Sequence, residues 1–270
     1  MITATVILLI IGVLIALAIG LVVKFFAVEV DPLLEQVSAI MPGTNCGACG
    51  YAGCAGYAAA LVGRKAQPGD CPAMSDSLLH QLCELLGVED VKKERRVAVV
   101  FCSGNDQNAT RQAFYNGVNR CRDAMLVAAG AKSCTYGCLG LGACAQACPY
   151  GAIEVRNRLA IVHPELCRAC GLCVQTCPKK LIRLVPASAP IHVFCSSPAR
   201  GSFKRNACKT ACIGCRRCVK AAEENQIRMN GFLAVINYGN PPAAEVAQSC
   251  PTAALRANVT QVEANKDSSI

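Results

Sequence analysis

Cysteine is the residue type through which this sequence could do chemistry. The chain has 21 cysteines among 270 residues, and most stand in short groups with two to five residues between them. One group reads CRACGLCVQTCP, from Cys167 to Pro178. Thiolates at these spacings are typical of iron–sulfur ligands, and nearby glycines let backbone N–H groups approach the sulfurs. Zinc held by four thiolates is the alternative. The odd count and the spacings argue against a disulfide framework.

A second run, CTYGCLGLGACAQACP, precedes this group and extends from Cys134 to Pro149. Together the two runs resemble a bacterial two-cluster ferredoxin, where three cysteines of one run and the fourth of the other hold each [4Fe-4S] cluster. The resemblance implies one cluster on Cys148, Cys167, Cys170 and Cys173. It implies another on Cys134, Cys138, Cys144 and Cys177, with Cys134 replacing the thiol that is absent at Leu141.

A different arrangement of cysteines occurs nearer the N-terminus. The stretch NCGACGYAGC and a later Cys-Pro pair supply four thiols, Cys46, Cys49, Cys54 and Cys71. The short glycine-rich loops between them can wrap one cluster. A zinc or redox-dithiol knuckle is the alternative, because C-x2-C alone is common. The four cysteines without a nearby histidine favour iron.

A third ferredoxin-like run, ACIGCRRCVKAA, reaches Ala222 where a fourth cysteine would stand. It belongs to an internal repeat, since the apolar stretch VAVVFC at 97–102 is echoed by HVFC at 192–195, and each is followed by a cysteine group. By the ferredoxin rule, Ala222 would have served a neighbouring cluster that this chain does not build. The remaining set for one cluster is Cys212, Cys215, Cys218 and Cys250, with Cys208 as an alternative to Cys215.

These four sets give four [4Fe-4S] clusters and leave a few cysteines without a ligand role. Cys83, Cys102, Cys121 and Cys195 are interpreted as small buried hydrophobic residues. A further cluster built from Cys102, Cys121 and Cys195 would lack an obvious fourth ligand.

The N-terminal segment is apolar. From Ile2 to Val23 the chain carries no charge, and Lys24 is the first charged residue. At about 1.5 Å per helical residue, this segment is long enough to cross a hydrocarbon core of roughly 30 Å. A cleaved signal peptide would need a basic start and a small-residue cleavage site. The sequence therefore predicts a single-pass membrane anchor, with the cysteine-rich part on the cytoplasmic side of a bacterial inner membrane, where thiols stay reduced.

The predicted fold class is a small α+β protein with several modules. The expected boundaries are a transmembrane anchor at 1–27, an N-terminal 4Fe-4S domain at 28–90, a connecting segment at 91–131, a two-cluster ferredoxin-like domain at 132–187 and a degenerate one-cluster domain at 188–270. An amphipathic helix is expected after Ser75 or Asp76, ending before Gly87. A buried strand is expected at 97–102.

No phosphate-binding loop, complete G-x-G-x-x-G fingerprint or catalytic triad is present, so the cysteines indicate one-electron transfer without catalytic residues. The net charge of +9 suits either docking of an acidic electron carrier or attraction to a membrane surface. No nucleic-acid partner is expected.

The apolar N-terminal segment, NCGACGYAGC, CTYGCLGLGACAQACP and CRACGLCVQTCP, in this order, closely resemble the B subunit of the Rnf ion-translocating electron transport complex. The resemblance covers nearly all of residues 1–185. It implies a subunit of an ion-translocating (Na+ or H+) ferredoxin:NAD+ oxidoreductase that passes electrons from reduced ferredoxin to membrane subunits. The chain is then part of an enzyme without being one alone. The alternative is an iron–sulfur subunit of another membrane-associated or corrinoid-linked oxidoreductase.

Overall fold

The structure, a computed structural model, describes residues 2–26, 31–91 and 94–257. Helix α1 (Ile2–Phe26) covers the apolar N-terminal segment. Counted over the described residues alone, no helix is long and apolar enough to cross a membrane. The membrane anchor therefore stays a prediction.

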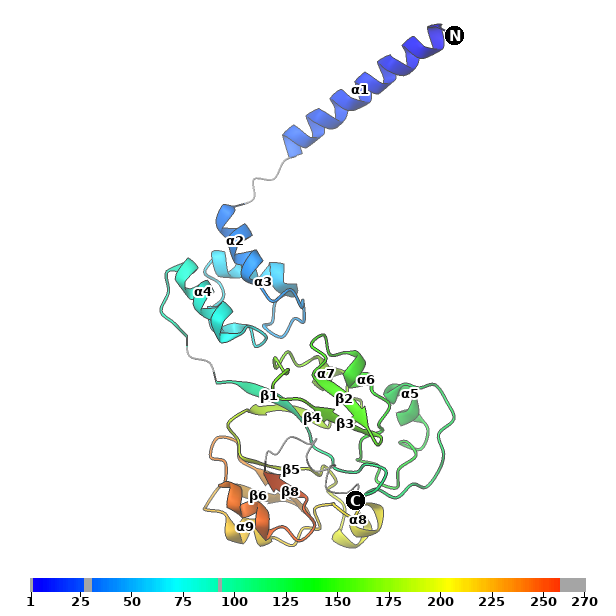
Figure 1. The fold of residues 1–270 in the computed structure, drawn as a ribbon, viewed down its shortest axis with the longest axis vertical. Helices are drawn as coiled ribbons and strands as arrows, with labels where there is room; N and C mark the ends of the chain where they lie inside the picture. The colour runs from blue at the N-terminus through cyan, green and yellow to red at the C-terminus, as the bar shows by residue number, and fades with distance from the viewer. Residues whose placement is uncertain (1, 27–30, 92–93, 258–270) are drawn as a thin grey trace.

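A helical region follows α1 (Figure 1). It consists of α2 (Pro32–Ile40), α3 (Gly53–Val62), the short 3-10 helix η1 (Pro68–Asp70) and α4 (Asp76–Leu86). The helix expected after Ser75 is confirmed, because the Ser75 side chain caps α4 and Gly87 ends it in the left-handed conformation, at φ 63°. Val37, Tyr57 and Leu82 from three of these helices form the buried core.

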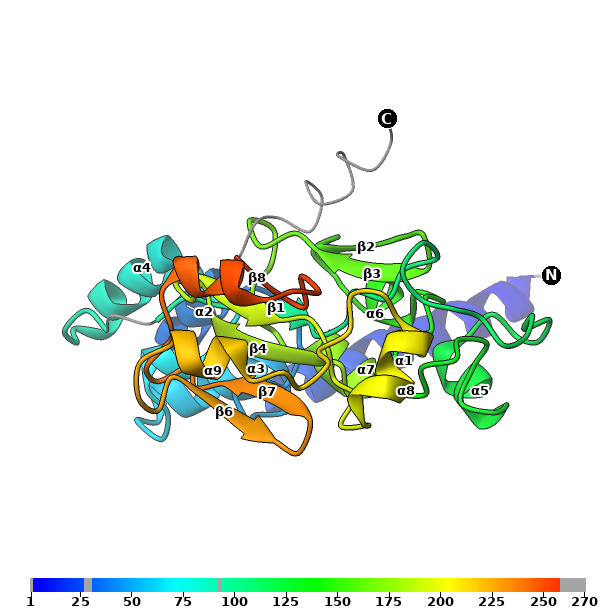
Figure 2. The ribbon, with the colours of Figure 1, turned by 90° about the horizontal axis from the view of Figure 1, so that it is seen from below.

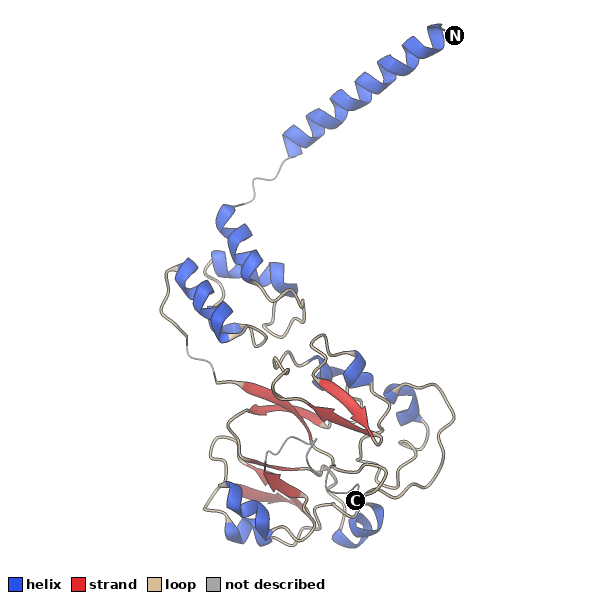
Figure 3. Ribbon diagram, viewed as in Figure 1, coloured by secondary structure: helices blue, strands red, loops and turns tan. Residues whose placement is uncertain are grey.

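The remainder contains four two-stranded antiparallel sheets (Figure 3). β1 (Arg96–Val100) pairs with β4 (Ile182–Pro186), β2 (Ile153–Arg156) with β3 (Leu159–Val162), β5 (Ile191–Val193) with β8 (Leu255–Ala257), and β6 (Ile227–Asn230) with β7 (Leu233–Ile236). Short helices connect them: α5 (Cys121–Leu126), α6 (Ala143–Gln146), α7 (Leu172–Thr176), α8 (Gly201–Ala207), α9 (Arg217–Ala221) and η2 (Ala244–Ser249). The small mixed α and β fold agrees with the predicted class.

The structure shows the internal repeat. The apolar stretch at 97–102 supplies β1, and its echo supplies β5, so both expected strands form. In each copy the first strand pairs with a strand that follows the last cysteine of the copy, β4 or β8. Each copy also has one hairpin, β2–β3 or β6–β7. Figure 2 shows β1 and β4 between these two hairpins.

The two copies make reciprocal contacts just after their first strands. Ser103 Oγ donates to the carbonyl oxygen of Phe194 at 3.2 Å, and Ser196 Oγ donates to that of Phe101 at 2.8 Å. The two phenylalanines share a small buried core. The copies are thus related by an approximate two-fold arrangement at this contact.

Residues 91–131, expected as a connecting segment, contribute structure to both copies. They supply β1, which is central to the first copy, and α5. Ala109 also forms an isolated bridge with Cys208 of the second copy. The segment is therefore integrated into the fold, while the exact domain boundaries remain predictions.

Candidate iron–sulfur centres

None of the 21 cysteines, all of which lie in the described residues, forms a disulfide. The N-terminal set extends from the loop after α2 to Cys71, the residue that follows η1. Cys71 is buried in the core of the helical region, and Cys46 and Cys49 pack against that core. The loop that carries them is held by Asn45, whose Oδ1 accepts from the backbone N–H of Cys54 at 2.7 Å. Gly53 leaves room for this side chain, since a Cβ there would sit 2.8 Å from Asn45 Oδ1.

Three cysteines of the run from Cys167 to Pro178, together with one cysteine of the preceding run, surround one cavity. Cys148, Cys167, Cys170 and Cys173 line an empty volume of about 320 Å³. The backbone N–H of Ala98, on β1, donates to Cys167 Sγ at 3.3 Å. The structure thus brings together the four thiols that the ferredoxin resemblance groups, with an N–H donor of the kind that tunes cluster thiolates.

The neighbouring cavity differs from the expectation in one residue. Its empty volume is about 400 Å³ and its four thiols are Cys121, Cys138, Cys144 and Cys177. Cys134, expected in this set, lies on another cavity. Cys121, the first residue of α5, completes the set of four thiols in place of the cysteine that is absent at position 141.

The backbone explains why Cys134 lies elsewhere. Its neighbour Ser133 donates its N–H to the carbonyl oxygen of Thr110 at 2.9 Å, and Lys132 bridges to Arg111. These contacts hold the strand-like segment before Cys134 against residues that also touch the second copy. One sequence signal could have indicated Cys121. The run from Cys134 to Pro149 has Leu141 where a cysteine is expected, and Cys121 is a nearby cysteine upstream of Cys138.

The degenerate module also encloses one cavity. Cys212, Cys215, Cys218 and Cys250 line an empty volume of about 360 Å³. The backbone N–H of Leu255 donates to Cys250 Sγ at 3.4 Å, as that of Leu181 does to Cys177 Sγ in the first copy. The structure places Cys215, and not Cys208, in this set. Cys208 lies with Cys134 on the other cavity.

Burial makes these thiols weak acids. Desolvation, followed by the charges of neighbouring cysteines, raises the pKa of Cys144 and of Cys173 to about 12. The same causes raise the pKa of Cys218 to about 11. Without metal these groups would be neutral thiols at pH 7, and a bound cation would be needed to hold them as thiolates.

The described residues do not form a compact mononuclear metal site. Among them, no group of three or more His, Cys, Asp or Glu side chains is arranged to hold a metal ion. Three of the four thiol sets instead surround cavities, an arrangement that suits a larger group such as a four-iron cluster. No histidine lines the four-thiol cavities described above.

Comparisons with known proteins bear on these sites. A family model described as a putative Fe-S cluster matches residues 41–73, and one described as a 4Fe-4S binding domain matches residues 160–183. The chain is 35% identical to the B subunit of the ion-translocating oxidoreductase complex of Methanosarcina acetivorans, over 86% of this chain and 89% of the relative.

Two further relatives are similar over most of their length. The B subunit of the Na(+)-translocating ferredoxin:NAD(+) oxidoreductase complex of Acetobacterium woodii is 37% identical, over 92% of this chain and 75% of the relative. The proton-translocating counterpart of Clostridium ljungdahlii is 35% identical, over 96% of this chain and 93% of the relative.

Proposed function

Because the chain belongs to the family of B subunits of Rnf-type ion-translocating oxidoreductase complexes, we propose that its clusters relay electrons from a soluble reduced ferredoxin to membrane subunits. The chain is an electron-transfer iron–sulfur subunit of an enzyme complex of the ferredoxin:NAD+ oxidoreductase class. The two relatives with a stated ion differ, one naming Na+ and the other protons, so both ions remain in the proposal.

The observation that supports a relay is the contact between successive thiol sets. Cys170 is buried in the same core as Cys71 of the N-terminal set. Thr44 Oγ1 and Tyr150 Oη are hydrogen-bonded at 3.0 Å across the same contact. Because electron tunnelling weakens steeply with distance, neighbouring clusters at these sets suit transfer between the helical region and the ferredoxin-like module.

The next two thiol sets of the relay also share a buried core. Cys144, from the set that includes Cys121, and Cys173, from the set that includes Cys170, are buried in one core. Three sets therefore form a continuous series.

The proposed ligands follow these sets. Four clusters would be held by Cys46, Cys49, Cys54 and Cys71; by Cys148, Cys167, Cys170 and Cys173; by Cys121, Cys138, Cys144 and Cys177; and by Cys212, Cys215, Cys218 and Cys250. When bound, each cluster supplies a reversible one-electron carrier. The protein supplies the thiolates, N–H donors such as Ala98 and Leu255, and the exclusion of water.

The exchange of Cys134 for Cys121 can be tested by additivity. Cys121→Ala and Cys177→Ala should each lower the bound iron by about four atoms, because each removes a ligand from the same cluster. The double variant should lose no more iron than either single variant. Iron and acid-labile sulfide are measured on the anaerobically purified chain. A further loss in the double variant would place Cys121 and Cys177 on different clusters.

The same proposal includes a membrane anchor at residues 1–27 and a cytoplasmic position for the rest. The apolar, uncharged stretch from Ile2 to Val23 supports the anchor, and many cysteines at metal-ligand spacings suit a reducing compartment. The N-terminal set follows the anchor closely in sequence. We therefore place the exit toward the membrane subunits at the cluster of Cys46, Cys49, Cys54 and Cys71.

Cys49→Ser tests this exit. In washed membranes that hold the whole complex, reduction of the membrane partners by reduced ferredoxin should fall to the background rate, because the last carrier before the membrane is damaged. Cys83→Ala is the matched control, since Cys83 is buried in the same core and belongs to none of the four sets. Immunoblotting of the washed membranes checks that both variants are retained. A wild-type rate in Cys49→Ser would contradict the proposed exit.

A further inference from the structure

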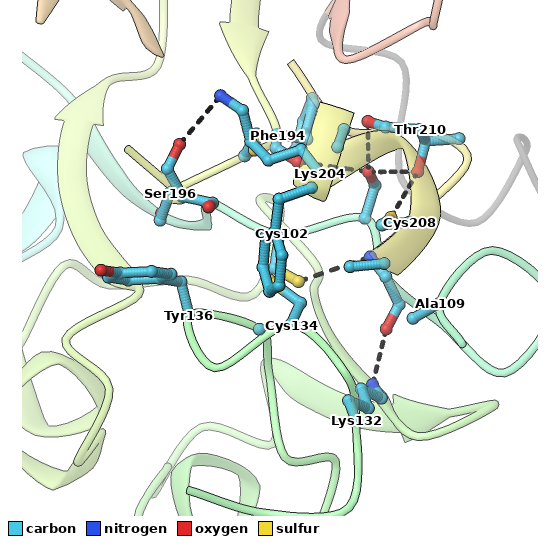
Figure 4. Close-up of a pocket in the computed structure, with 18 residues that line it drawn as sticks. Cys102, Ala109, Lys132, Cys134, Tyr136, Phe194, Ser196, Lys204, Cys208 and Thr210 are labelled. Carbon is cyan, nitrogen blue, oxygen red and sulfur yellow. Dashed lines mark hydrogen bonds between the residues drawn. The ribbon is translucent and has the colours of Figure 1, made fainter. Parts of the chain in front are cut away.

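Four cysteines outside the sixteen proposed ligands line one cavity. They are Cys102, Cys134, Cys195 and Cys208, and the cavity has an empty volume of about 470 Å³. Figure 4 shows Cys102, Cys134 and Cys208 gathered at this cavity. The three other four-thiol cavities measure about 320, 400 and 360 Å³, so this one has at least their capacity.

The cavity lies between the two copies of the repeat, and each copy supplies two thiols. Cys102 follows β1 and Cys195 follows β5, at equivalent places. Cys134 and Cys208 each stand four positions before the next cysteine, Cys138 or Cys212. A set that is symmetric under the repeat is not expected of cysteines that only fill space in a core.

Backbone donors point at the thiols in the same symmetric way. Cys102 Sγ accepts from the backbone N–H groups of Gly104 and of Cys138, both at 3.4 Å. In the second copy burial raises the pKa of Cys195, and the backbone N–H groups of the equivalent residues, Ser197 and Cys212, act to lower it. Such N–H donors to sulfur are the usual surroundings of cluster thiolates.

The empty space separates sulfurs from different copies. A Cβ built on Gly104 would lie 3.6 Å from Cys102 Sγ and 3.8 Å from Cys208 Sγ. Both sulfurs therefore border the same small region, one from each side. Cys134 and Cys195 line the same cavity.

Two buried lysines supply positive charge beside the thiols. Lys132 Nζ donates to the carbonyl oxygens of Gly104 at 2.5 Å and Arg158 at 2.7 Å, and Lys204 Nζ donates to that of Ser197 at 3.1 Å. The two lysines are 6% and 1% exposed. No carboxylate among the described residues forms an ion pair with either of them.

Buried ammonium groups are costly unless a negative charge lies near them. The carbonyl oxygens accept hydrogen bonds from the two ammonium groups, but they carry no net charge and do not balance the positive charge. A four-iron cluster with four thiolate ligands carries net negative charge and would compensate for both lysines. Four neutral thiols would not.

We propose that Cys102, Cys134, Cys195 and Cys208 hold a fifth [4Fe-4S] cluster at the contact between the two copies. It would accept one electron from a neighbouring cluster and pass one on, with no net change. Cys102 Sγ accepts from the backbone N–H of Cys138, and Cys195 and Cys212 pack against the same core. The fifth cluster thus joins the set of Cys138 to the set of Cys212, which would otherwise stand apart. This extends the proposed relay, but the site itself does not depend on which donor the complex uses.

The test is the metal content of the purified full-length chain. We expect about twenty irons and as many sulfides in the wild type, and about sixteen of each in the double variant Cys195→Ala/Cys208→Ala. Cys83→Ala, the matched control, should keep the wild-type content. These measurements do not require ferredoxin, so their failure is separate from failure of the proposed function. About sixteen irons in the wild type with no loss in the double variant would overturn the fifth cluster, as would one bound zinc or four alkylatable thiols in the native wild type.

A second pair of variants applies if the double variant does not fold. Lys204→Met should make the midpoint potential of one cluster more negative in an EPR-monitored redox titration, because it removes a buried positive charge that stabilises the reduced, more negative form. Arg205→Met is the matched control, since Arg205 lies on the same helix α8 but is exposed and screened by water. Unchanged potentials for every cluster in Lys204→Met would contradict the proposal.

Discussion

Removing the iron–sulfur clusters is expected to unfold the two ferredoxin-like copies and to open Lys132 and Lys204 to trypsin. The sheets have two strands each, and such sheets are marginally stable without further packing. The cores between them contain cluster-site cysteines, including Cys144 in the first copy and Cys218 in the second. Without a cluster, these cores surround empty cavities, and binding free energy that contributes to folding is lost.

The depleted chain is prepared with an oxidant and a chelator, and the cut sites are read by mass spectrometry. Lys132 and Lys204 are buried, so the intact protein should resist cleavage there. Arg200 is exposed and serves as an internal control that is cut in both states. Reconstitution with iron and sulfide should restore protection. If both lysines stay protected after depletion, the fold does not depend on its clusters.

Gly140→Ala is expected to have the largest effect on stability among the glycine-to-alanine substitutions. Gly140 has φ +72°, where a side chain is strained, and its Cβ would overlap the carbonyl group of Arg158 in the turn between β2 and β3. The conformational strain costs about 1–2 kcal/mol and the overlap about 1–3 kcal/mol more. The hairpin would have to move away from the loop that carries Cys138 and Cys144.

Gly151→Ala separates these two contributions. Gly151 also has positive φ, +61°, but a Cβ there meets no atom within 4 Å. It should therefore show the strain alone. The temperature at which the clusters bleach is compared at one scan rate, because such unfolding is irreversible. Equal bleaching temperatures for the two variants would show that the β2–β3 hairpin moves away from residue 140 with no loss of stability.

Local sequence spacing predicted the parts of the sites that lie within one loop. The runs around Cys46, Cys167 and Cys212 place two or three thiols within a few residues, so the short loop itself restricts where the sulfurs lie. The helix beginning at Asp76 and the strands β1 and β5 were also predicted, because capping residues and apolar runs act over the same short range. Their neighbours along the chain are sufficient to determine them.

The sequence did not predict which cysteines separated by long segments share a cavity. Cys134 was grouped with Cys138 because the two are close in sequence, but the backbone contacts of Ser133 and Lys132 turn it toward the second copy. Cys121 was regarded as a packing residue, and α5 brings it to the cavity of Cys138. A long flexible segment permits many end-to-end positions, so its sequence length does not say which thiol it delivers.

The sequence by itself favoured iron–sulfur clusters over zinc, and its motifs indicated the family. Thiolate chemistry and short spacings are the reason for that preference. Only the tertiary structure decided which thiols share a cavity. Cys102 and Cys195 come together with Cys134 and Cys208 because the two copies pack against each other through Phe101 and Phe194. A contact between copies has no signature in either copy alone, since neither one encloses the cavity.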